Sequence, residues 1–557
     1  MKKLPVGLSD FKQIVKNNYY FIDKSLFIKE IIDEDAAVLL LPRPRRFGKS
    51  FNLSQLYYYF NINEKESLFA DLKISRTAER YQKEKNKYPV IKIDFKGVSA
   101  VNWTEAAENL KRIIASEYKN HYYLFNSELL MDYEKDEFKK IIDLSADISS
   151  YKFSLEKLSD YLARFHKQKA IILIDEYDEP IQSGYLNDYY QQIISFMRTF
   201  LIRALKDNNN VEKGILTGVL RIARESIFSG LNNLVVSSLL DEKYNQYFGL
   251  LTAEVEKIFR DFDLEYKLAE IKQWYNGYNF GGEIIYNPWS IINCIYQKGE
   301  LNPYWVNTSD NQLVKDLILK SANGLKKDLE QLLIAESIKV KIEENLVFNE
   351  IQNRSSTVWT FLLFSGYLKA ENFERIEAKL YADLKIPNQE LKYIYEEIIS
   401  DWFQENLSND KIEQLLEALI TADFDVFEAL LSEFVLNSFS FFDTAVDQAE
   451  QVYHSFILGL LLNLENRYYL KSNRESGYGR YDIMLIPKAK KDKAIIIEFK
   501  KALEFKDESL EKAADSGLKQ IEEKNYRAEL NEKENDGVIE IAVAFSGTKL
   551  LLKGREI

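Results

Sequence analysis

The sequence predicts an α/β protein in which a parallel sheet with a helical lid and connector precedes a smaller domain of order αβββαβ. Three observations favour this architecture. Apolar stretches typical of strands buried on both faces alternate with helical periodicity in the first half of the chain. Residues from about 252 to 442 show mostly helical periodicity. Short strands, turns and one charged helix then follow in a different order near the C-terminus.

The first strand is predicted at residues 36–41, and it breaks at a proline into a basic turn, residues 43–48. Apolar side chains recur at helical spacing over residues 53–60, so the basic turn precedes a helix N-terminus. Unpaired backbone N–H groups and the helix dipole favour an anion there. Lys49 can therefore reach the β- and γ-phosphates of a nucleotide, and the Ser50 hydroxyl can ligate Mg²⁺.

The predicted nucleotide-binding residues of this part of the chain are Arg46, Phe47, Gly48, Lys49 and Ser50. The general phosphate-loop pattern, G-x-x-x-x-G-K-[ST], has a glycine where Arg43 stands in this sequence. An alternative interpretation is therefore a basic loop before an ordinary amphipathic helix.

A second buried strand, predicted at residues 170–174, ends in two adjacent carboxylates. The carboxyl ends of parallel strands are where α/β sheets bind their ligands. We expect Asp175 to hold Mg²⁺, directly or through water, and Glu176 to polarise the attacking water. Acidic turns after strands are common, so this assignment depends on its combination with the basic turn.

A third strand, predicted at residues 213–216, leads to Thr217. Its hydroxyl is predicted to sense the γ-phosphate or to position water. Arg221 and Arg224 follow, and either could neutralise transition-state charge as an arginine finger does. The alternative is that both arginines pair with acidic surface groups.

These stretches resemble the AAA-ATPase-like family, whose members commonly precede a PD-(D/E)XK nuclease domain. The residues that carry the resemblance are 43–50, 173–178, 216–218 with 226–233, and 274–278. The resemblance implies a P-loop NTPase sheet with a helical lid, and ATP and Mg²⁺ as cofactors. An arginine at the first-glycine position looks normal in that family.

The amino-acid composition excludes several kinds of metal site and bears on the compartment and partners of the protein. One cysteine, Cys294, excludes an internal disulfide and a cysteine-cluster metal site, and three histidines give little support to zinc chemistry. No apolar run approaches membrane-spanning length and the N-terminus lacks a signal-peptide core, so we expect a cytoplasmic protein without a membrane partner. The net charge of −13 argues against general coating of nucleic acid but permits a local basic groove.

We expect three domains in a chain of 557 residues. Residues 1–304 would form the sheet with its lid, residues 305–442 a mostly helical connector, and residues 443–557 the αβββαβ domain. The elements predicted in this last domain are a helix at 452–464, strands at 468–472, 480–486 and 494–500, a helix at 509–526, and a strand at 539–545.

Asp482 and Glu498 lie on two of these strands, and the short loop between the strands favours an antiparallel pair with facing carboxylates. Such a pair can hold Mg²⁺, a hard cation that prefers oxygen ligands. Glu498 and Lys500 are two positions apart and share one face of their strand. Lys500 can then orient or help deprotonate a metal-bound water and offset charge on a scissile phosphate. Without this context, a Glu-x-Lys at a strand end is usually a surface ion pair.

This segment resembles the PD-(D/E)XK nuclease superfamily, with Asp482 and Glu498-Phe499-Lys500 at the signature positions. Gln520 and Tyr526 resemble the glutamine and tyrosine often found near the DNA in exonuclease-like branches. The resemblance implies Asp482, Glu498 and Lys500 as catalytic residues and nucleic acid as the partner, with DNA favoured over RNA.

The main hypothesis is an ATP-binding and ATP-hydrolysing switch that controls a Mg²⁺-dependent nuclease, with a homo-oligomer among the expected assemblies. The alternative is a nucleotide-binding sensor or a scaffold whose nuclease-like domain binds nucleic acid or protein without cutting. The acidic net charge and the arginine at position 43 motivate this alternative.

Overall fold

The computed structural model describes most of the chain and divides it into two compact units. The first unit is Met1–Ser321 with Ser337–Leu391, and the second is Ala322–Glu336 with Lys392–Ile557. The residues described are 2–221, 227–228, 230–305, 314, 317, 328, 331–332, 337–344, 355–395, 409–439, 457, 460–461, 464, 466–476, 479–502, 509–530, 536–546 and 549–557.

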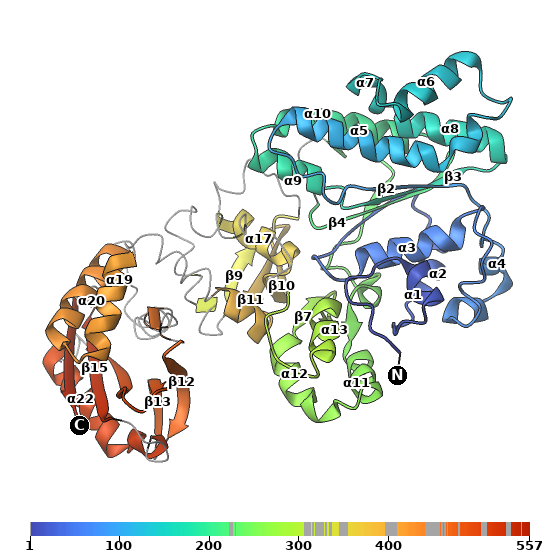
Figure 1. The fold of residues 1–557 in the computed structure, drawn as a ribbon. Coiled ribbons are helices and arrows are strands. Elements are labelled where there is room, and N and C mark those ends of the chain that lie inside the picture. The colour runs from blue at the N-terminus through green and yellow to red at the C-terminus, as the bar shows by residue number, and fades with distance from the viewer. Residues whose placement is uncertain are drawn as a thin grey trace. The chain divides into compact units, whose positions relative to one another are not determined.

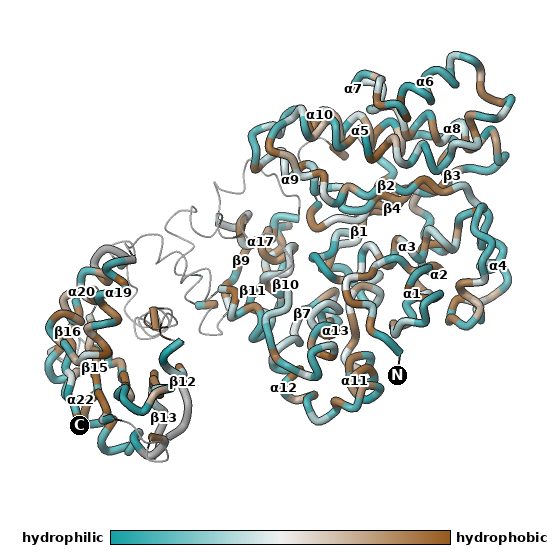
Figure 2. The backbone as a smooth tube through the Cα atoms, viewed as in Figure 1, coloured by the Kyte–Doolittle hydropathy of each residue, from teal (hydrophilic) through white to brown (hydrophobic). Residues whose placement is uncertain are grey.

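A five-stranded parallel sheet organises the first unit, in the order β2-β3-β4-β1-β5 (Figure 1). Its strands are β1 (Val38–Pro42), β2 (Val90–Asp94), β3 (Ala170–Asp175), β4 (Val211–Gly218) and β5 (Leu234–Val236). β1, β2 and β3 are mostly hydrophobic, and β1 and β3 are buried throughout, as is typical of central parallel strands (Figure 2). Because β4 lies between β1 and β3, Thr217 lies between the basic turn and the carboxylates that follow β3.

Helices cover both faces of this sheet (Figure 1). One face carries α1 (Phe11–Lys16), α2 (Leu26–Ile32) and α3 (Lys49–Phe60), and the other carries α5 (Trp103–Asn120), α8 (Ser154–His166) and α10 (Tyr190–Leu205). The other helices of this part are α4 (Glu79–Gln82), α6 (Asp132–Ile142), α7 (Ile148–Tyr151) and α9 (Glu179–Leu186). The predicted alternation of strands and helices is confirmed.

The predicted helical lid contains three helices and a small antiparallel sheet. The helices are α11 (Thr252–Asp261), α12 (Leu268–Tyr275) and α13 (Pro288–Tyr296), and the strands are β6 (Leu250–Leu251), β7 (Tyr278–Phe280) and β8 (Glu283–Tyr286). Asn287 begins α13, because its side chain accepts hydrogen bonds from the backbone N–H groups of Trp289 and Ser290. Proline at the first position of the helix favours the same start.

The segment predicted as a mostly helical connector, residues 305–442, also contains a second antiparallel sheet. Before residue 386 its described elements are β9 (Ile338–Lys341), α17 (Ser355–Ser365), β10 (Lys369–Ile376) and β11 (Lys379–Lys385). The β10–β11 hairpin turns through Glu377 and Ala378, both with positive φ. Such turns normally carry asparagine or glycine, so the sequence offers no hairpin signal at this point.

A buried carboxylate, Glu390, ties α13 to the residues that follow the lid. It is fully buried, and it accepts hydrogen bonds from the Ser290 hydroxyl, at 2.8 and 3.0 Å, and from the Trp305 backbone N–H, at 2.9 Å. Burial raises the pKa of Glu390 to about 7. This carboxyl group therefore titrates near neutral pH in the folded protein.

We expect the stability of the first unit to fall as the pH rises from 5.5 to 7.5. The folded-state pKa of Glu390 lies above the ordinary value of 4.5, so its stabilising contribution is full at low pH and is lost through about pH 7. Over this range the unfolding free energy of the wild type should fall by about 2 kcal/mol relative to Glu390→Gln. Urea unfolding of both proteins at several pH values measures the difference, and parallel profiles would contradict the assignment.

The second unit contains a mixed five-stranded sheet in the order β12-β13-β14-β15-β16. Its elements are β12 (Tyr468–Ser476), β13 (Gly479–Pro487), β14 (Ala494–Lys501), α22 (Leu510–Glu523), β15 (Val538–Ser546) and β16 (Lys549–Glu556). Only β14 and β15 pair in parallel, and α22 connects them. The four predicted strands and the charged helix are confirmed, and β16 is an additional strand. The helix predicted at 452–464 lies mostly outside the described residues.

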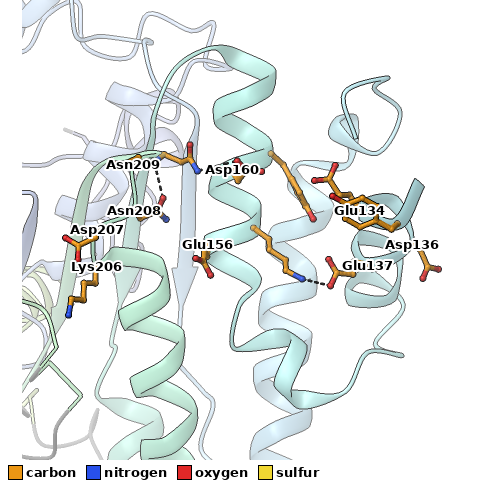
Figure 3. A pocket seen from close by; sticks show the side chains of 13 residues that line it. Glu134, Asp136, Glu137, Glu156, Asp160, Lys206, Asp207, Asn208 and Asn209 are labelled. Carbon is orange, nitrogen blue, oxygen red and sulfur yellow. Dashed lines mark hydrogen bonds and ion pairs between the residues drawn. The ribbon is translucent and has the colours of Figure 1, made fainter. Parts of the chain in front are cut away.

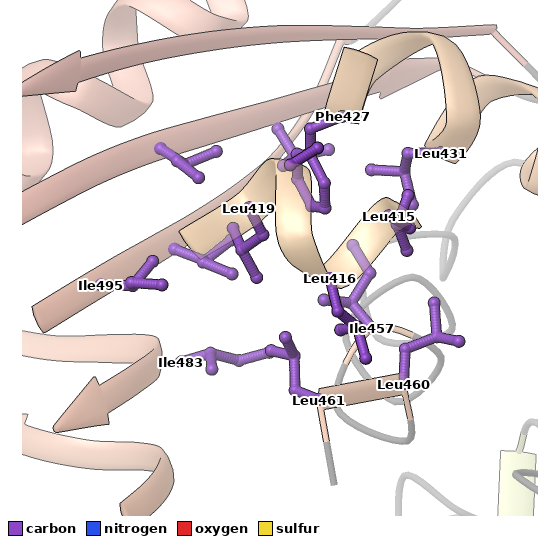
Figure 4. Packing of buried hydrophobic residues seen from close by; sticks show 14 of the residues in the cluster. Leu415, Leu416, Leu419, Phe427, Leu431, Ile457, Leu460, Leu461, Ile483 and Ile495 are labelled. Atoms are coloured by element: carbon purple, nitrogen blue, oxygen red, sulfur yellow. The ribbon is translucent and has the colours of Figure 1, made fainter. Parts of the chain in front are cut away.

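Alternate residues of the strands point to opposite faces of this sheet, and each face packs in a separate hydrophobic core. One face packs against α19 (Asn409–Ile420) and α20 (Phe424–Phe439), and Leu419, Phe427, Ile483 and Ile495 belong to one cluster of buried side chains (Figure 4). The opposite face packs against α22 through residues such as Ile496 and Ile521. Residues 409–439 belong to the segment predicted as the connector, but their apolar side chains are buried in the same core as these strands. Among the described residues, no helix is both long and apolar enough to cross a membrane.

Candidate nucleotide and nuclease sites

The basic turn joins β1 to α3 as predicted. Gly48 is the N-cap of α3 with φ of +86°, a conformation that glycine adopts without strain. A Cβ atom at this position would meet nothing within 4 Å, so the space beside the helix N-terminus is open. An anion in that space would meet the unpaired N–H groups of the first helical turn.

Arg43, which stands where the general motif has glycine, is a fully buried structural residue. Its Nη1 donates to the carbonyl oxygens of Pro42, at 2.8 Å, and Ser237, at 2.6 Å. Its guanidinium carbon lies 4.9 Å from the ring centre of Phe248, and burial lowers the pKa of Arg43 to about 9. Arg43 therefore joins the base of the turn to the residues after β5, a role that the motif comparison did not predict.

Arg43→Gly, which restores the general motif, should destabilise the first unit by about 2–4 kcal/mol. The change removes a large buried side chain and leaves two carbonyl oxygens without their donor. Urea unfolding measures the loss, and Arg45→Gly is the matched control because the side chain of Arg45 is only half-buried. Unchanged stability together with tighter ATP binding in Arg43→Gly would contradict this role.

The Lys49 side chain is only 3% exposed, and its ammonium group lies 3.3 Å from a carboxylate oxygen of Glu176. It also donates to the Pro44 carbonyl oxygen at 3.2 Å. Lys49 and Glu176 are far apart in the sequence, and the structure brings them together as the nucleotide-site prediction requires. Each group neutralises the other in this conformation.

Asp175 and Thr217 also lie together, because β3 and β4 are neighbours. The Thr217 hydroxyl donates a hydrogen bond to Asp175 Oδ1, and both side chains are buried. Asp94 lies opposite Asp175 on β2, and burial, followed by the charge of Asp175, raises the pKa of Asp94. Thr217 therefore contacts the carboxylate that was predicted to hold Mg²⁺.

Asp178 is a further residue of this region for which the sequence predicted no role. Its Oδ2 accepts the backbone N–H groups of Val219, at 2.9 Å, and Leu220, at 2.8 Å. Burial, followed by the charge of Glu176, raises the pKa of Asp178 to about 7. The contact fixes the turn that begins just before Arg221. It depends on β4 being next to β3, which the sequence does not reveal.

The remaining predicted nucleotide-site residues differ in their surroundings. Phe47 is fully buried against Tyr278 and Phe280, so only its backbone is available to a ligand. The Arg46 guanidinium stacks 4.2 Å from the Trp289 ring centre, and burial lowers the pKa of Arg46. Ser50 and Arg221 are half-buried. The other predicted residue, Arg224, lies in the segment 222–226, which is outside the described residues, as is residue 229.

The predicted nuclease residues lie on one face of the second sheet. The β13–β14 ladder includes Ile483 opposite Ile497, so Asp482 and Glu498 occupy the next facing positions. Asp482 Oδ2 accepts the backbone N–H of Phe499 at 2.8 Å. The two carboxylates are thus on adjacent strands, as the spacing of the sequence predicted.

Glu498 is 2% exposed on its side chain and lies at the centre of the group. Lys500 donates to its Oε1 at 2.9 Å, and the Gln520 amide donates to the same oxygen. Gln520 also donates to the Tyr526 hydroxyl at 3.0 Å. The structure therefore brings Lys500, Gln520 and Tyr526 to Glu498, although Tyr526 lies in a 3₁₀ turn beyond the end of α22.

Two features hold α22 and the following turn against the strands. A Cβ at Gly517 would lie 2.8 Å from the Ala542 Cβ and 3.3 Å from the Lys500 Cγ, so the absence of a side chain permits close packing. Arg527, next to Tyr526, pairs with the buried carboxylate of Glu540. These contacts position Gln520 and Tyr526 beside Glu498.

The donor set fits Mg²⁺, which accepts one or two carboxylates and keeps several waters. Asp482 and Glu498 supply carboxylate oxygens from facing strand positions. In the part of the chain that the structure describes, no group of three or more histidine, cysteine, aspartate or glutamate side chains is arranged to hold a metal. The arrangement therefore fits a two-carboxylate magnesium site and does not fit a transition-metal cluster.

A pocket of about 830 Å³ lies elsewhere in the first unit, between α6, α8 and residues 206–210 (Figure 3). Six carboxylate side chains and two lysines line it, and Lys157 pairs with Glu137 across part of it. None of the predicted nucleotide-site residues lines this pocket.

Comparison with known proteins agrees with the two groups of residues. Residues 5–228 match a family described as "Predicted AAA-ATPase", and residues 448–554 match the PD-(D/E)XK nuclease superfamily. The chain is also 28% identical over 437 residues to "Uncharacterized protein in vnfD 5'region" of Azotobacter chroococcum mcd 1, a match that covers 78% of this chain and 77% of that protein. Residues 5–228 are thus similar to the AAA-ATPase-like family, and residues 448–554 are similar to the PD-(D/E)XK nuclease superfamily.

Proposed function

We propose that the protein is an ATP-binding and ATP-hydrolysing switch that controls Mg²⁺-dependent cleavage of nucleic acid. The observation that carries the proposal is the grouping of Asp482, Glu498 and Lys500 on one face of the second sheet. Gln520 and Tyr526 lie beside the same carboxylate, where a nucleic-acid strand could contact them. DNA is the expected substrate and RNA the second choice.

In the nuclease-like domain, Asp482 and Glu498 would hold Mg²⁺, which supplies a polarised water and neutralises phosphate charge when bound. Lys500 is held by Glu498 and can orient the attacking water or stabilise charge on the scissile phosphate. Gln520 donates to Glu498 and so fixes the orientation of that carboxylate.

In the AAA-ATPase-like domain, the ATP phosphates would enter at the basic turn and the N-terminus of α3. Lys49 would then exchange its ion pair with Glu176 for a bond to phosphate. Glu176, once released, can polarise the attacking water, while Ser50 and Asp175 would hold Mg²⁺. Arg221 would approach the γ-phosphate from the turn that Asp178 fixes.

A second candidate function is a nucleotide-binding sensor that turns over ATP slowly. The contacts of Lys49 with Glu176 and of Thr217 with Asp175 favour it, because the groups needed for catalysis bind one another. Tight retention of ADP and little phosphate release would support the sensor. Rapid ATP hydrolysis would support the switch.

The test is cleavage of labelled single- and double-stranded DNA and RNA by the full-length protein. Each substrate is incubated with Mg²⁺ or EDTA, and with or without ATP. We expect cleavage that requires Mg²⁺ and changes in rate with ATP. Absence of cleavage under every condition, with intact ATP binding, would favour the sensor. Light scattering of the same samples tests for a homo-oligomer.

A further inference from the structure

Four consecutive residues of the basic turn contact elements that lie much later in the first unit. A Cβ at Gly366 would lie 2.8 Å from the Pro44 Cβ, so α17 ends directly against Pro44. The Trp305 indole N–H donates a hydrogen bond to the Arg45 carbonyl oxygen at 3.3 Å. The Arg46 guanidinium stacks on the Trp289 ring, and the Phe47 ring contacts the Tyr278 ring. The shape of the turn is therefore held by the lid and by residues that follow the lid.

Glu390 connects two of these contacts. Its carboxylate accepts the backbone N–H of Trp305, whose indole holds Arg45, and the hydroxyl of Ser290. Ser290 adjoins Trp289, the ring on which Arg46 stacks. One buried carboxylate thus lies a single hydrogen bond from each of the two segments that contact the turn. The nucleotide-site roles of Lys49 and Glu176 make no use of it.

Glu390 also belongs to the last segment of the first unit. Asn388 Oδ1 accepts the backbone N–H of Leu391 at 3.1 Å, which caps the helical residues 389–395. A Cβ at Gly277 would lie 2.2 Å from the Pro387 carbonyl oxygen, so this segment lies against the lid without space for a side chain. Leu391 is the last residue of the first unit, and the chain then continues into the second.

We propose that Glu390 is a positioning residue that fixes the basic turn through Trp305 and transmits nucleotide binding at that turn to residues 386–391. The inference rests on the proposed function, because it takes the basic turn as the phosphate site. A phosphate bound by the turn fixes the orientation of its peptide groups, and the hydrogen bond that the Arg45 carbonyl accepts from Trp305 depends on that orientation. Nucleotide binding should therefore strengthen the contacts of Trp305 and Glu390.

This coupling between the basic turn and residues 386–391, which we call the relay, is reciprocal, as any coupling between two sites must be. Loss of the Glu390 contacts should weaken nucleotide binding, because the turn would no longer be preorganised for the phosphate. We expect Glu390→Ala and Trp305→Phe each to weaken ADP binding by about three- to ten-fold, the range for one or two lost hydrogen bonds. Glu390→Gln retains an acceptor for Trp305 and should restore most of the affinity.

The experiment measures ADP binding and backbone hydrogen exchange on the full-length protein. ADP should change the exchange of residues 386–391 in the wild type, and the change should be lost in Trp305→Phe. Trp103→Phe is the matched control, because Trp103 lies on α5 and contacts Tyr189. If Glu390→Ala fails to fold, the wild-type exchange and Trp305→Phe still decide the question.

Two negative results have different meanings. ADP binding to the wild type with no change at residues 386–391, and with normal affinity in Trp305→Phe, would overturn the relay and leave the proposed function standing. No ADP binding to the wild type would overturn the nucleotide site itself and the relay with it.

Discussion

Asp482→Ala should reduce nucleic-acid cleavage by more than about 100-fold. Loss of a residue that merely supports a metal ligand typically costs 10- to 100-fold, and Asp482 is proposed to be a ligand itself. The side chain also accepts the Phe499 N–H, so alanine removes one contact between β13 and β14. Asp482→Asn keeps an oxygen for that N–H and loses only the charge, and it should be equally inactive while remaining folded.

Lys500→Ala should abolish cleavage while leaving Asp482 and Glu498 in place. Lys501→Ala is the matched control, because Lys501 is the next lysine on the same strand and points to the opposite face. Initial rates on the preferred substrate, with circular dichroism to verify folding, measure both variants. An active Lys500→Ala protein would remove the lysine from the mechanism, and an active Asp482→Asn protein would remove the proposed magnesium site.

The nuclease group was predictable because local rules determine it. Glu498 and Lys500 share a face through the two-residue period of a strand, and the short loop before β14 leaves little freedom in the register. The ladder pair Ile483–Ile497 is the one that brings Asp482 to the position facing Glu498. The spacing of the motif residues therefore predicted most of this arrangement of side chains.

The nucleotide group was predictable only in part, since strand order decides its contacts. The basic turn and the carboxylates after β3 follow from the position of polar residues at strand ends. The contacts of Thr217 with Asp175 and of Asp178 with Val219 exist because β4 lies beside β3, and the sequence does not specify this order. Likewise, the burial of Arg43 involves Ser237, 194 positions away.

The middle of the chain was predicted least well for a related reason. The β10–β11 hairpin has a turn without asparagine or glycine, so its strands lack their usual boundary signal. Helix α19 has an ordinary amphipathic sequence and α20 is more uniformly apolar, and neither sequence reveals the sheet that covers its apolar residues. Hydrophobic periodicity predicted these helices but not the strands against which they pack.

Lys49→Ala should weaken ATP binding by about 100-fold or more. A hydrogen bond to a charged group contributes about 1.5–3 kcal/mol, and Lys49 is proposed to contact two phosphates. Isothermal titration with ATP and Mg²⁺ measures the loss. Lys12→Ala is the matched control, because Lys12 also pairs with glutamates but does so at Glu64 and Glu66, near the other end of α3.

Glu176→Gln should have the opposite effect on binding. A carboxylate oxygen of Glu176 lies 3.3 Å from the Lys49 ammonium group, so ATP must displace this carboxylate before its phosphates can bind Lys49. Removing that charge should tighten ATP binding while it abolishes hydrolysis, because the glutamine cannot polarise the attacking water. If Lys49→Ala weakened and Glu176→Gln strengthened binding, the ion pair would be a competitor of the phosphate. If both variants bound ATP as the wild type does, the pair would be purely structural and the phosphate would have to bind elsewhere.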